Sequence, residues 1–236
     1  MKVEIWSDVV CPWCYVGKRQ FEGALSRFAH ADEVDVEWRS FELDPTSPTR
    51  VGMSMDRILE RKYGVTEEQA RAANQRMTGL AAGVGLEYHL DRVQAGNTFD
   101  AHRLIHLAAT HGLGDAMKER LLAAYFTEGR AVGDRDVLSE LAAEVGLDPT
   151  EVGAVLDGDA FGAVVREDEA QAAALGVTGV PFFVIDDAFG VSGAQPPEVL
   201  LGALERAWSE SHPLTVLGEP GQDADGGACA DGACAV

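Results

Sequence analysis

Cys11 and Cys14 are the residues whose types and spacing most directly suggest chemistry, because two thiols at this spacing can form and break an internal disulfide. They lie in the run Ser-Asp-Val-Val-Cys-Pro-Trp-Cys-Tyr-Val-Gly-Lys at residues 7–18. A Cys-X-X-Cys pair can also bind a metal or act as a redox sensor. The local structure that holds the sulfurs decides between these chemistries.

A strand followed by a helix is predicted around this pair. Val3 and Ile5 alternate with charged or polar neighbours, as in a short strand. Pro12 suits the first helical position, because it has no N–H to lose and its φ already fits a helix, which leaves Cys11 as the N-cap. The apolar residues that follow recur at the spacing of one helical face: Trp13, Phe21, Leu25 and Phe28.

This position favours an ionised sulfur at Cys11. Unpaired N–H groups and the positive end of the helix dipole lower a thiol pKa from about 8.5 to about 3.5–7.5. We therefore expect a lowered pKa for Cys11 and assign it as the nucleophile. Cys14 lies one turn further along and is expected to be less exposed, so that it attacks a mixed disulfide at Cys11 and resolves it.

Composition limits the partners and the compartment. The chain has 236 residues, of which 46% are hydrophobic, enough for one elaborated domain or two small ones. Its formal net charge of −20 argues against nucleic acid or an anionic membrane as a partner. The first residues show no secretory signal and no apolar span is seen, so we expect a cytoplasmic protein. The 4 cysteines form two close pairs, which argues against a structural disulfide framework.

The order of predicted elements gives an α/β fold in four parts. Residues 1–45 form a β-α-β unit whose second strand covers residues 34–39 and continues through Phe41 and Leu43. Residues 46–176 form an inserted helical domain, and residues 177–211 form a β-β-α unit with strands near 180–186 and 188–192 and a helix near 197–209. Residues 212–236 form a flexible, glycine-rich tail that carries Cys229 and Cys234. Within the inserted domain, helices are predicted near 54–63, 66–84, 98–111, 115–128, 134–145 and 160–175.

This order is that of a thioredoxin-like fold with a mixed central sheet and a large helical insertion after the second strand. The first two strands are expected to be parallel neighbours, and the last two an antiparallel pair, with helices on both faces of the sheet.

From residue 1 to about residue 210, the chain resembles the DsbA family of thiol–disulfide oxidoreductases, and within it the FrnE-like subgroup. The resemblance rests on the Cys-Pro-Trp-Cys run together with three further motifs: Phe41-Glu-Leu-Asp-Pro45, Asn97-Thr-Phe-Asp-Ala-His-Arg-Leu104 and Gly176-Val-Thr-Gly-Val-Pro-Phe-Phe183. It implies dithiol–disulfide exchange with a protein or small-molecule partner, without a metal or cofactor other than the redox-active disulfide. Oxidase, reductase and isomerase directions stay open, because the reduction potential decides between them.

The resemblance also implies a cis peptide before Pro181, which would lie against the Cys-X-X-Cys turn. The main chain of Val180 would then be free to hydrogen-bond an extended substrate as an added strand; the alternative is a proline that merely opens a strand. Pro12 and Trp13 are further candidates for substrate contact. Asn97 and His102 belong to a subgroup motif and are assigned first to local structure, with Asn97 as a helix N-cap, and second to substrate contact. His102 and His106 share a helix face, and we expect packing or solvated positions rather than metal ligation.

The proton acceptor for the resolving thiol stays unassigned. Many thioredoxins carry a buried carboxylate six residues before the first cysteine, and here that position is Ile5. Glu4 points to the opposite face of an ideal strand, and Asp8 is expected in the following loop, so neither is a safe substitute.

Other functions remain open. Cys11, Cys14, Cys229 and Cys234 could supply four thiolates to zinc, although structural zinc sites prefer tightly held ligands. The tail pair could instead relay electrons to Cys11 and Cys14, act as an independent redox sensor, or bind metal. Thioredoxin-like relatives with helical insertions also include glutathione-dependent isomerases and transferases of aromatic or polyketide-type small molecules. Such enzymes need one activating position near Cys11, whereas a second sulfur favours exchange chemistry.

Overall fold

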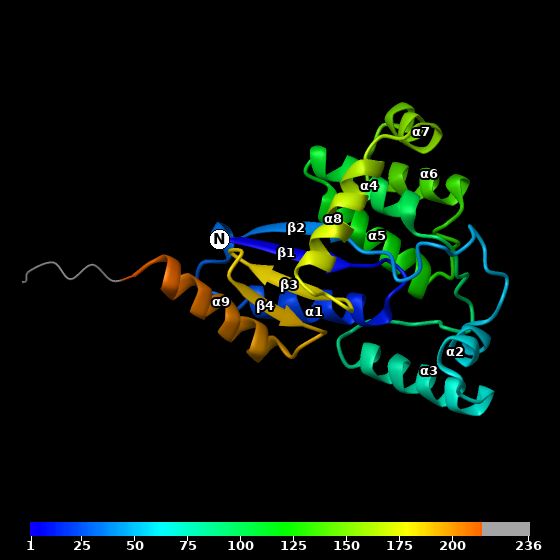
Figure 1. Cartoon of the computed structure of the whole chain (residues 1–236), viewed down its shortest axis with the longest axis horizontal. Coiled ribbons are helices and arrows are strands. Elements are labelled where there is room, and N and C mark those ends of the chain that lie inside the picture. Colours follow the sequence, from blue (N-terminus) through cyan, green and yellow to red (C-terminus); the bar gives the residue numbers. More distant parts are fainter. Residues whose placement is uncertain (214–236) are drawn as a thin grey trace, which may run out of the picture.

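The computed structural model describes residues 1–213 and shows a four-stranded mixed sheet with helices on both faces (Figure 1). The strand order is β2-β1-β3-β4, with β1 parallel to β2 and antiparallel to β3, and with β3 antiparallel to β4. The predicted fold class and mixed sheet are confirmed. The strands are β1 Lys2–Ser7, β2 Asp35–Ser40, β3 Phe182–Ile185 and β4 Phe189–Ser192.

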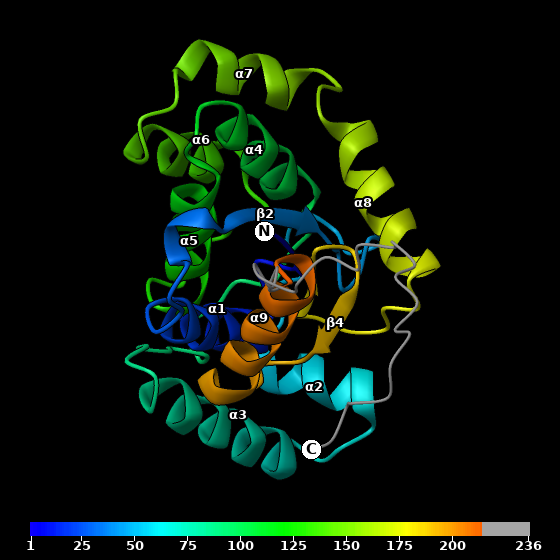
Figure 2. The same ribbon diagram turned by 90° about the vertical axis from the view of Figure 1, so that its left-hand side faces the viewer.

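The helices flank the sheet on both sides (Figure 2). The helices are α1 Pro12–Leu25, α2 Met55–Tyr63, α3 Glu67–Ala82, α4 Phe99–Thr110, α5 Gly114–Phe126, α6 Arg135–Glu144, α7 Pro149–Asp157, α8 Gly162–Ala174 and α9 Pro197–Ser211, with a short 3₁₀ turn at Ala31–Glu33. Seven of these nine helices of the described chain therefore lie between β2 and β3.

Alternation along the strands explains the two faces of the sheet. Val3 and Ile5 of β1 are fully buried in the main core with α1 and α9, and the ring centroid of Phe21 on α1 lies 5.6 Å from that of Phe183 on β3. The opposite face carries Trp6, which packs in a smaller cluster with residues of α8 and β3. β1 is thus covered on both faces, as expected for the centre of a sheet.

Two predictions about the elements were wrong. The second strand ends at Ser40 rather than continuing through Leu43, because side chains occupy the backbone donors beyond it: the Glu42 N–H donates to Oε1 of Glu169 at 3.2 Å, and the Leu43 N–H donates to Oδ2 of Asp8 at 2.8 Å. Helix α7 was missed altogether. Its Asp148 accepts hydrogen bonds from the N–H groups of Thr150 and Glu151, with a proline at the start of the helix, a standard N-terminal signal.

Candidate active site

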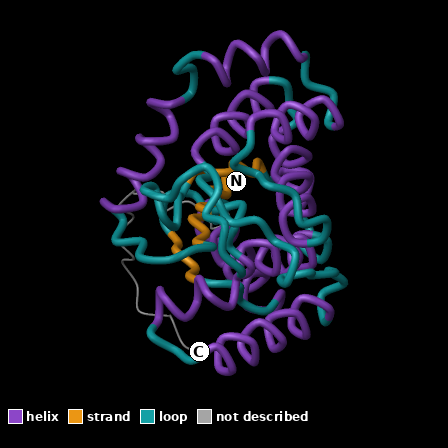
Figure 3. Tube along the Cα trace, turned by 90° about the vertical axis from the view of Figure 1, so that its right-hand side faces the viewer, coloured by secondary structure: helices purple, strands orange, loops and turns teal. Residues whose placement is uncertain are grey.

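The two cysteines lie where β1 leads into α1. Cys11 is the N-cap, with φ −89° and ψ 114°, and Pro12 is the first helical residue, as predicted. Figure 3 views the molecule from the C-terminal end of β1, where loops lie between the helices. Both cysteines are free thiols, and Cys11 is 5% exposed against 1% for Cys14. Cys11 is therefore the sulfur nearer to solvent.

The loop before β3 lies directly against Cys11. The Val180–Pro181 peptide is cis, as the resemblance implied. The Cys11 thiol donates to the Val180 carbonyl, with Sγ and O 3.5 Å apart. The N–H of Val180 makes no hydrogen bond to any group in residues 1–213. An extended substrate could use this donor.

Gly17 allows Pro181 to come this close to the helix. A Cβ atom built at Gly17 would lie 2.7 Å from Cγ of Pro181, well inside contact distance. Sequence reasoning missed this role, although a glycine inside a helix is a signal of close approach. Any larger side chain would push Pro181 away from α1.

The two sulfurs ionise as a pair, and the pKa pattern differs from the sequence prediction. The hydrogen bond with Cys14, together with burial and the charge on Cys14, raises the pKa of Cys11 well above its ordinary value. Burial opposes ionisation of Cys14 too, but the hydrogen bond from Cys11 and the charge of Lys118 outweigh it and lower the pKa of Cys14. The predicted lowering at Cys11 is not found, because the interaction with Cys14 and burial outweigh the Cys14 N–H, which acts to lower the pKa of Cys11. The two sulfurs therefore titrate as one coupled pair, and the charge of Lys118 favours the ionised form of Cys14.

Lys118 and the Ser7 hydroxyl both act on Cys14 from the protein interior. Lys118 of α5 is fully buried, its Nζ donates to the Ser7 carbonyl at 3.0 Å, and it lies 5.3 Å from the ring centroid of Trp38. Burial lowers the pKa of Lys118 to about 8. The Ser7 hydroxyl is buried without a hydrogen-bond partner in residues 1–213, and it helps to lower the pKa of Cys14. Sequence reasoning missed both residues, since a lysine on an amphipathic helix ordinarily faces solvent.

His102 contacts Asp8, in the loop before Cys11, from the protein interior. It is fully buried, and its Nε2 lies 3.3 Å from Oδ1 of Asp8. Burial acts to raise the pKa of Asp8, but the hydrogen bond with His102 and the N–H of Leu43 hold it below its ordinary value. Asp8 therefore connects α4, the end of β2 and the loop of the cysteines.

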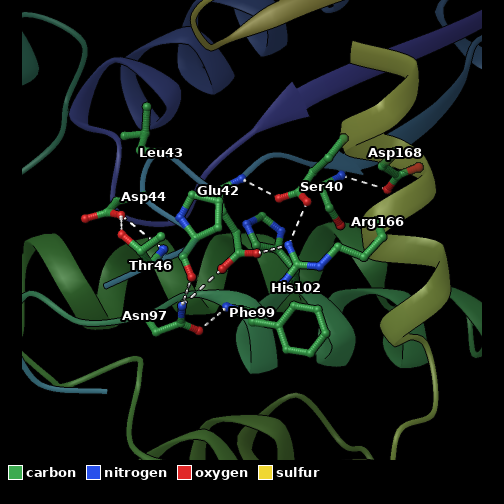
Figure 4. A network of polar contacts seen from close by, with 12 residues as sticks. Ser40, Glu42, Leu43, Asp44, Thr46, Asn97, Phe99, His102, Arg166 and Asp168 are labelled. Carbon is green, nitrogen blue, oxygen red and sulfur yellow. Dashed lines mark hydrogen bonds and ion pairs between the residues drawn. The ribbon is translucent and has the colours of Figure 1, made fainter. Parts of the chain in front are cut away.

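Asn97 belongs to the adjoining polar network (Figure 4). Its Nδ2 donates to Oε1 of Glu42 at 3.2 Å, and its Oδ1 accepts from the Phe99 N–H at 2.9 Å. The N-cap of α4 is Thr98 rather than Asn97, so that prediction was off by one residue. Arg166 of α8 pairs with the buried Glu42 from the other side.

The remaining candidates divide between surface and interior. The Trp13 side chain is 46% exposed next to the cysteines, whereas the Pro12 carbonyl accepts a hydrogen bond from the Tyr88 hydroxyl at 2.8 Å. His106 lies inside, where its Nε2 is 3.1 Å from Oδ2 of Asp168. Cys229 and Cys234 lie outside the described residues, so the tail relay and the zinc hypothesis stay predictions. No helix within residues 1–213 has the length and hydropathy needed to cross a membrane.

Comparison with known proteins places the chain in a family. The model of the DSBA-like thioredoxin domain matches residues 2–205. The crystal structure of a probable DsbA oxidoreductase from Streptomyces coelicolor is 47% identical, with a TM-score of 0.86, and the match covers 96% of this chain and 97% of that one. The uncharacterized protein YwbO of Bacillus subtilis (strain 168) is 29% identical over 209 residues, which are 86% of this chain and 94% of that protein.

A more distant likeness concerns the fold alone. A 2-hydroxychromene-2-carboxylate isomerase structure is 17% identical, with a TM-score of 0.65 over 92% of this chain and 100% of that one. The family model spans nearly all the described residues, and the similar oxidoreductase structure covers almost the whole chain. The chain belongs to the DsbA-like thioredoxin-domain family and is a thiol–disulfide oxidoreductase.

Proposed function

We propose that Cys11 and Cys14 exchange disulfides with a thiol substrate by cycling between a dithiol and an internal disulfide. The observation that carries this proposal is the pair itself: two free thiols at the start of α1, with Sγ of the outer one 3.5 Å from the Val180 carbonyl oxygen. Neither sulfur is held by a structural disulfide. Two thiols so placed can form a disulfide without a cofactor.

In the oxidising direction, a substrate thiolate attacks Sγ of Cys11, the Cys11–Cys14 bond breaks, and Cys14 leaves as a thiolate. A second substrate thiol, after losing its proton, then attacks the substrate sulfur of the mixed disulfide. The substrate leaves oxidised by two electrons, and Cys11 and Cys14 remain reduced. The reducing direction runs through the same mixed disulfide, with Cys14 attacking Cys11 and the substrate thiolate leaving.

The difference between the sulfurs supports these roles. Cys11 is the more exposed sulfur and is the one that a substrate reaches. Cys14 has the lowered pKa, and a thiol of lower pKa leaves faster in disulfide exchange. The assignment of Cys11 to the mixed disulfide therefore rests on access rather than on a lowered pKa of its own.

The surface beside Cys11 favours an extended substrate with an apolar residue near its cysteine. The Trp13 and Leu43 side chains are both exposed. Leu43 lies near the cysteines, because its N–H donates a hydrogen bond to Asp8, three residues before Cys11. Val180 offers the substrate main chain an N–H that has no partner within residues 1–213. Peptides fit this arrangement, and small thiols can reach the same sulfur.

Single-cysteine variants test the proposal. With a peptide disulfide as substrate, Cys11→Ser is expected to lose exchange. In Cys14→Ser the Cys11 thiolate attacks the substrate disulfide and releases a substrate thiolate, and the mixed disulfide at Cys11 is expected to accumulate and to be located by mass spectrometry, because no second enzyme thiol resolves it. Insulin reduction and refolding of scrambled ribonuclease, together with the midpoint potential of the pair, assign the direction. Full activity of Cys11→Ser, or failure of the wild-type pair to bond under oxidant, contradicts the proposal.

The same variants separate exchange from the glutathione-dependent alternative. An isomerase or transferase that activates glutathione needs one position near Cys11, so that Cys14→Ser would keep full turnover of an aromatic substrate. Exchange requires both sulfurs, and the chain has both at the site. We further propose a cytoplasmic location, since the pairing of its cysteines suits redox chemistry in that compartment.

A further inference from the structure

Lys118 is a buried cation without a carboxylate of its own. It is fully buried on α5, and in residues 1–213 its Nζ donates one hydrogen bond, to the Ser7 carbonyl, and forms no ion pair. Lys18 on α1 makes a useful contrast, because it is also buried but pairs with Glu22, Asp115 and Glu119. Burying an ammonium group that lacks a paired anion is costly. A negative charge nearby would offset that cost.

The groups that face Lys118 identify this charge. β1 and the loop after it supply the Ser7 carbonyl and Asp8, and β2 supplies the Trp38 ring. α1 supplies Cys14, Cys11 and, with the opposite sign, Lys18. Asp8 is already bound to His102 and to the Leu43 N–H. Lys118 also helps to lower the pKa of Asp8, but Cys14 is the larger charge that acts on Lys118, and Lys118 is the cation that acts on Cys14.

A second observation points to the same sulfur. The Ser7 hydroxyl is fully buried and has no hydrogen-bond partner in residues 1–213. An unsatisfied buried hydroxyl is rare and calls for an explanation. The Ser7 hydroxyl and Lys118 both favour the ionised form of Cys14, so the hydroxyl gains an acceptor when the thiolate forms. The Ser7 hydroxyl and Lys118 therefore both favour a negative charge at Cys14.

The geometry points to Lys118 as the counter-charge of the Cys14 thiolate, a role that differs from that of a proton-accepting carboxylate. This inference rests on the proposed exchange function. When a substrate thiolate opens the disulfide at Cys11, the electron pair of the broken bond goes to Cys14, and the ammonium of Lys118 stabilises it without a proton transfer. In the reverse step Cys14 attacks already ionised, and the departing substrate thiolate takes its proton from water.

The interaction must be reciprocal. If Lys118 lowers the pKa of Cys14, the Cys14 thiolate raises the pKa of Lys118 by the same free energy. Forming the disulfide removes that thiolate. The pKa of Lys118 is therefore expected to be higher in the dithiol protein than in the disulfide protein.

Lys118→Met tests the inference with a side chain of similar length and no charge. The matched control is Met117→Leu, which repacks the neighbouring buried position of α5 and leaves the charge in place. Thiolate absorbance is titrated in the full chain, and the titration of a Cys11→Ser/Cys14→Ser chain is subtracted to remove the tail thiols. We expect the pKa of the first thiol of the pair to rise by about one pH unit or more in Lys118→Met.

The redox equilibrium with glutathione provides a second readout. Loss of thiolate stabilisation should shift it about tenfold toward the disulfide, which corresponds to ~30 mV. Met117→Leu should keep the wild-type pKa and potential. Lys118→Met that folds with both values unchanged overturns the inference. A merely structural role of Lys118 would alter stability but neither value.

A measurement on the wild type covers the case in which Lys118→Met fails to fold. The chain has only four lysines, Lys2, Lys18, Lys62 and Lys118, so their ε-carbon signals can be followed by NMR in isotopically labelled protein. The inference requires one lysine that titrates at higher pH in the dithiol form than in the disulfide form, and equal titration in both forms refutes it. A wild-type chain that forms no Cys11–Cys14 disulfide refutes the proposed function itself. Normal exchange without coupling to Lys118 refutes only the role of this lysine.

Discussion

Replacing Gly17 by alanine should damage the site through one atom. The added Cβ would lie 2.7 Å from Cγ of Pro181, whereas carbon atoms pack at about 3.5–4.0 Å. The Pro181 ring must therefore move by about 1 Å, and overpacking of this kind costs ~1–3 kcal/mol. Against that stands a gain of ~1 kcal/mol, because alanine favours a helix more than glycine does. The net change in unfolding free energy should thus lie between about zero and a loss of ~2 kcal/mol.

The effect on activity should be larger than the effect on stability. Pro181 and Val180 are the proposed guides of the substrate, and a misplacement of about 1 Å in a positioning group can reduce a rate by about a hundredfold. We expect insulin reduction by Gly17→Ala to fall about tenfold to a hundredfold.

Gly23 on the same helix provides the control. A Cβ at Gly23 would meet Cγ of Pro197 at 3.6 Å, an ordinary contact. Gly23→Ala should therefore keep full activity and gain up to ~1 kcal/mol in urea unfolding. If Gly17→Ala matches Gly23→Ala in both assays, the close approach of Pro181 to α1 does not matter for function.

Three further outcomes are expected. Because the pKa of Asp8 is held below its ordinary value, its ionised form contributes stability above about pH 4 that is lost as the pH falls through its folded-state pKa. In urea unfolding at a series of pH values, the unfolding free energy of Asp8→Asn should therefore fall less steeply toward acid pH than that of the wild type. Equal slopes would exclude this role of Asp8. Trp13→Ala should change the unfolding free energy by less than ~0.5 kcal/mol but raise KM for a peptide with an apolar residue beside its cysteine, so an unchanged KM would remove Trp13 from the substrate surface. Lys118→Met should stabilise the fold near neutral pH by up to ~3 kcal/mol, since the difference between its ordinary pKa of 10.5 and about 8 corresponds to that cost of burying the ammonium group. The wild type should accordingly gain stability relative to Lys118→Met as the pH rises from about 8 to about 10.5, and parallel profiles of the two proteins would contradict this.

Local patterns in the sequence predicted most of the framework. Pro12 and the apolar spacing after it placed the start of α1 correctly, and the order of strands gave the mixed sheet. The end of β2 could not be predicted in this way. It depends on Asp8 and Glu169, which are distant in the sequence and take the N–H groups that would continue the strand.

The sulfurs themselves were predicted from the motif, but their electrostatics were not. Helix-terminus reasoning assigned the lowered pKa to Cys11, whereas the structure gives it to Cys14. The cause is tertiary: Lys118 arrives from α5, more than a hundred residues later in the chain. Leu121, Leu122 and Tyr125 follow Lys118 at helical spacing and place it on an apolar face, but this pattern does not show which group it meets there.

The position of Ile5 explains why the charged groups near the cysteines come from the helices, although β1 supplies the Ser7 hydroxyl. Ile5 is fully buried, pairs in register with Phe183, and belongs to the apolar core beneath α1. A carboxylate there would have to be buried in that core at a large desolvation cost. Instead, α4 contributes His102 and α5 contributes Lys118, and both reach the loop of the cysteines from its other side. The helices between β2 and β3 therefore do more than cover the site, because a change in how α4 and α5 pack should alter the ionisation of the pair through His102 and Lys118.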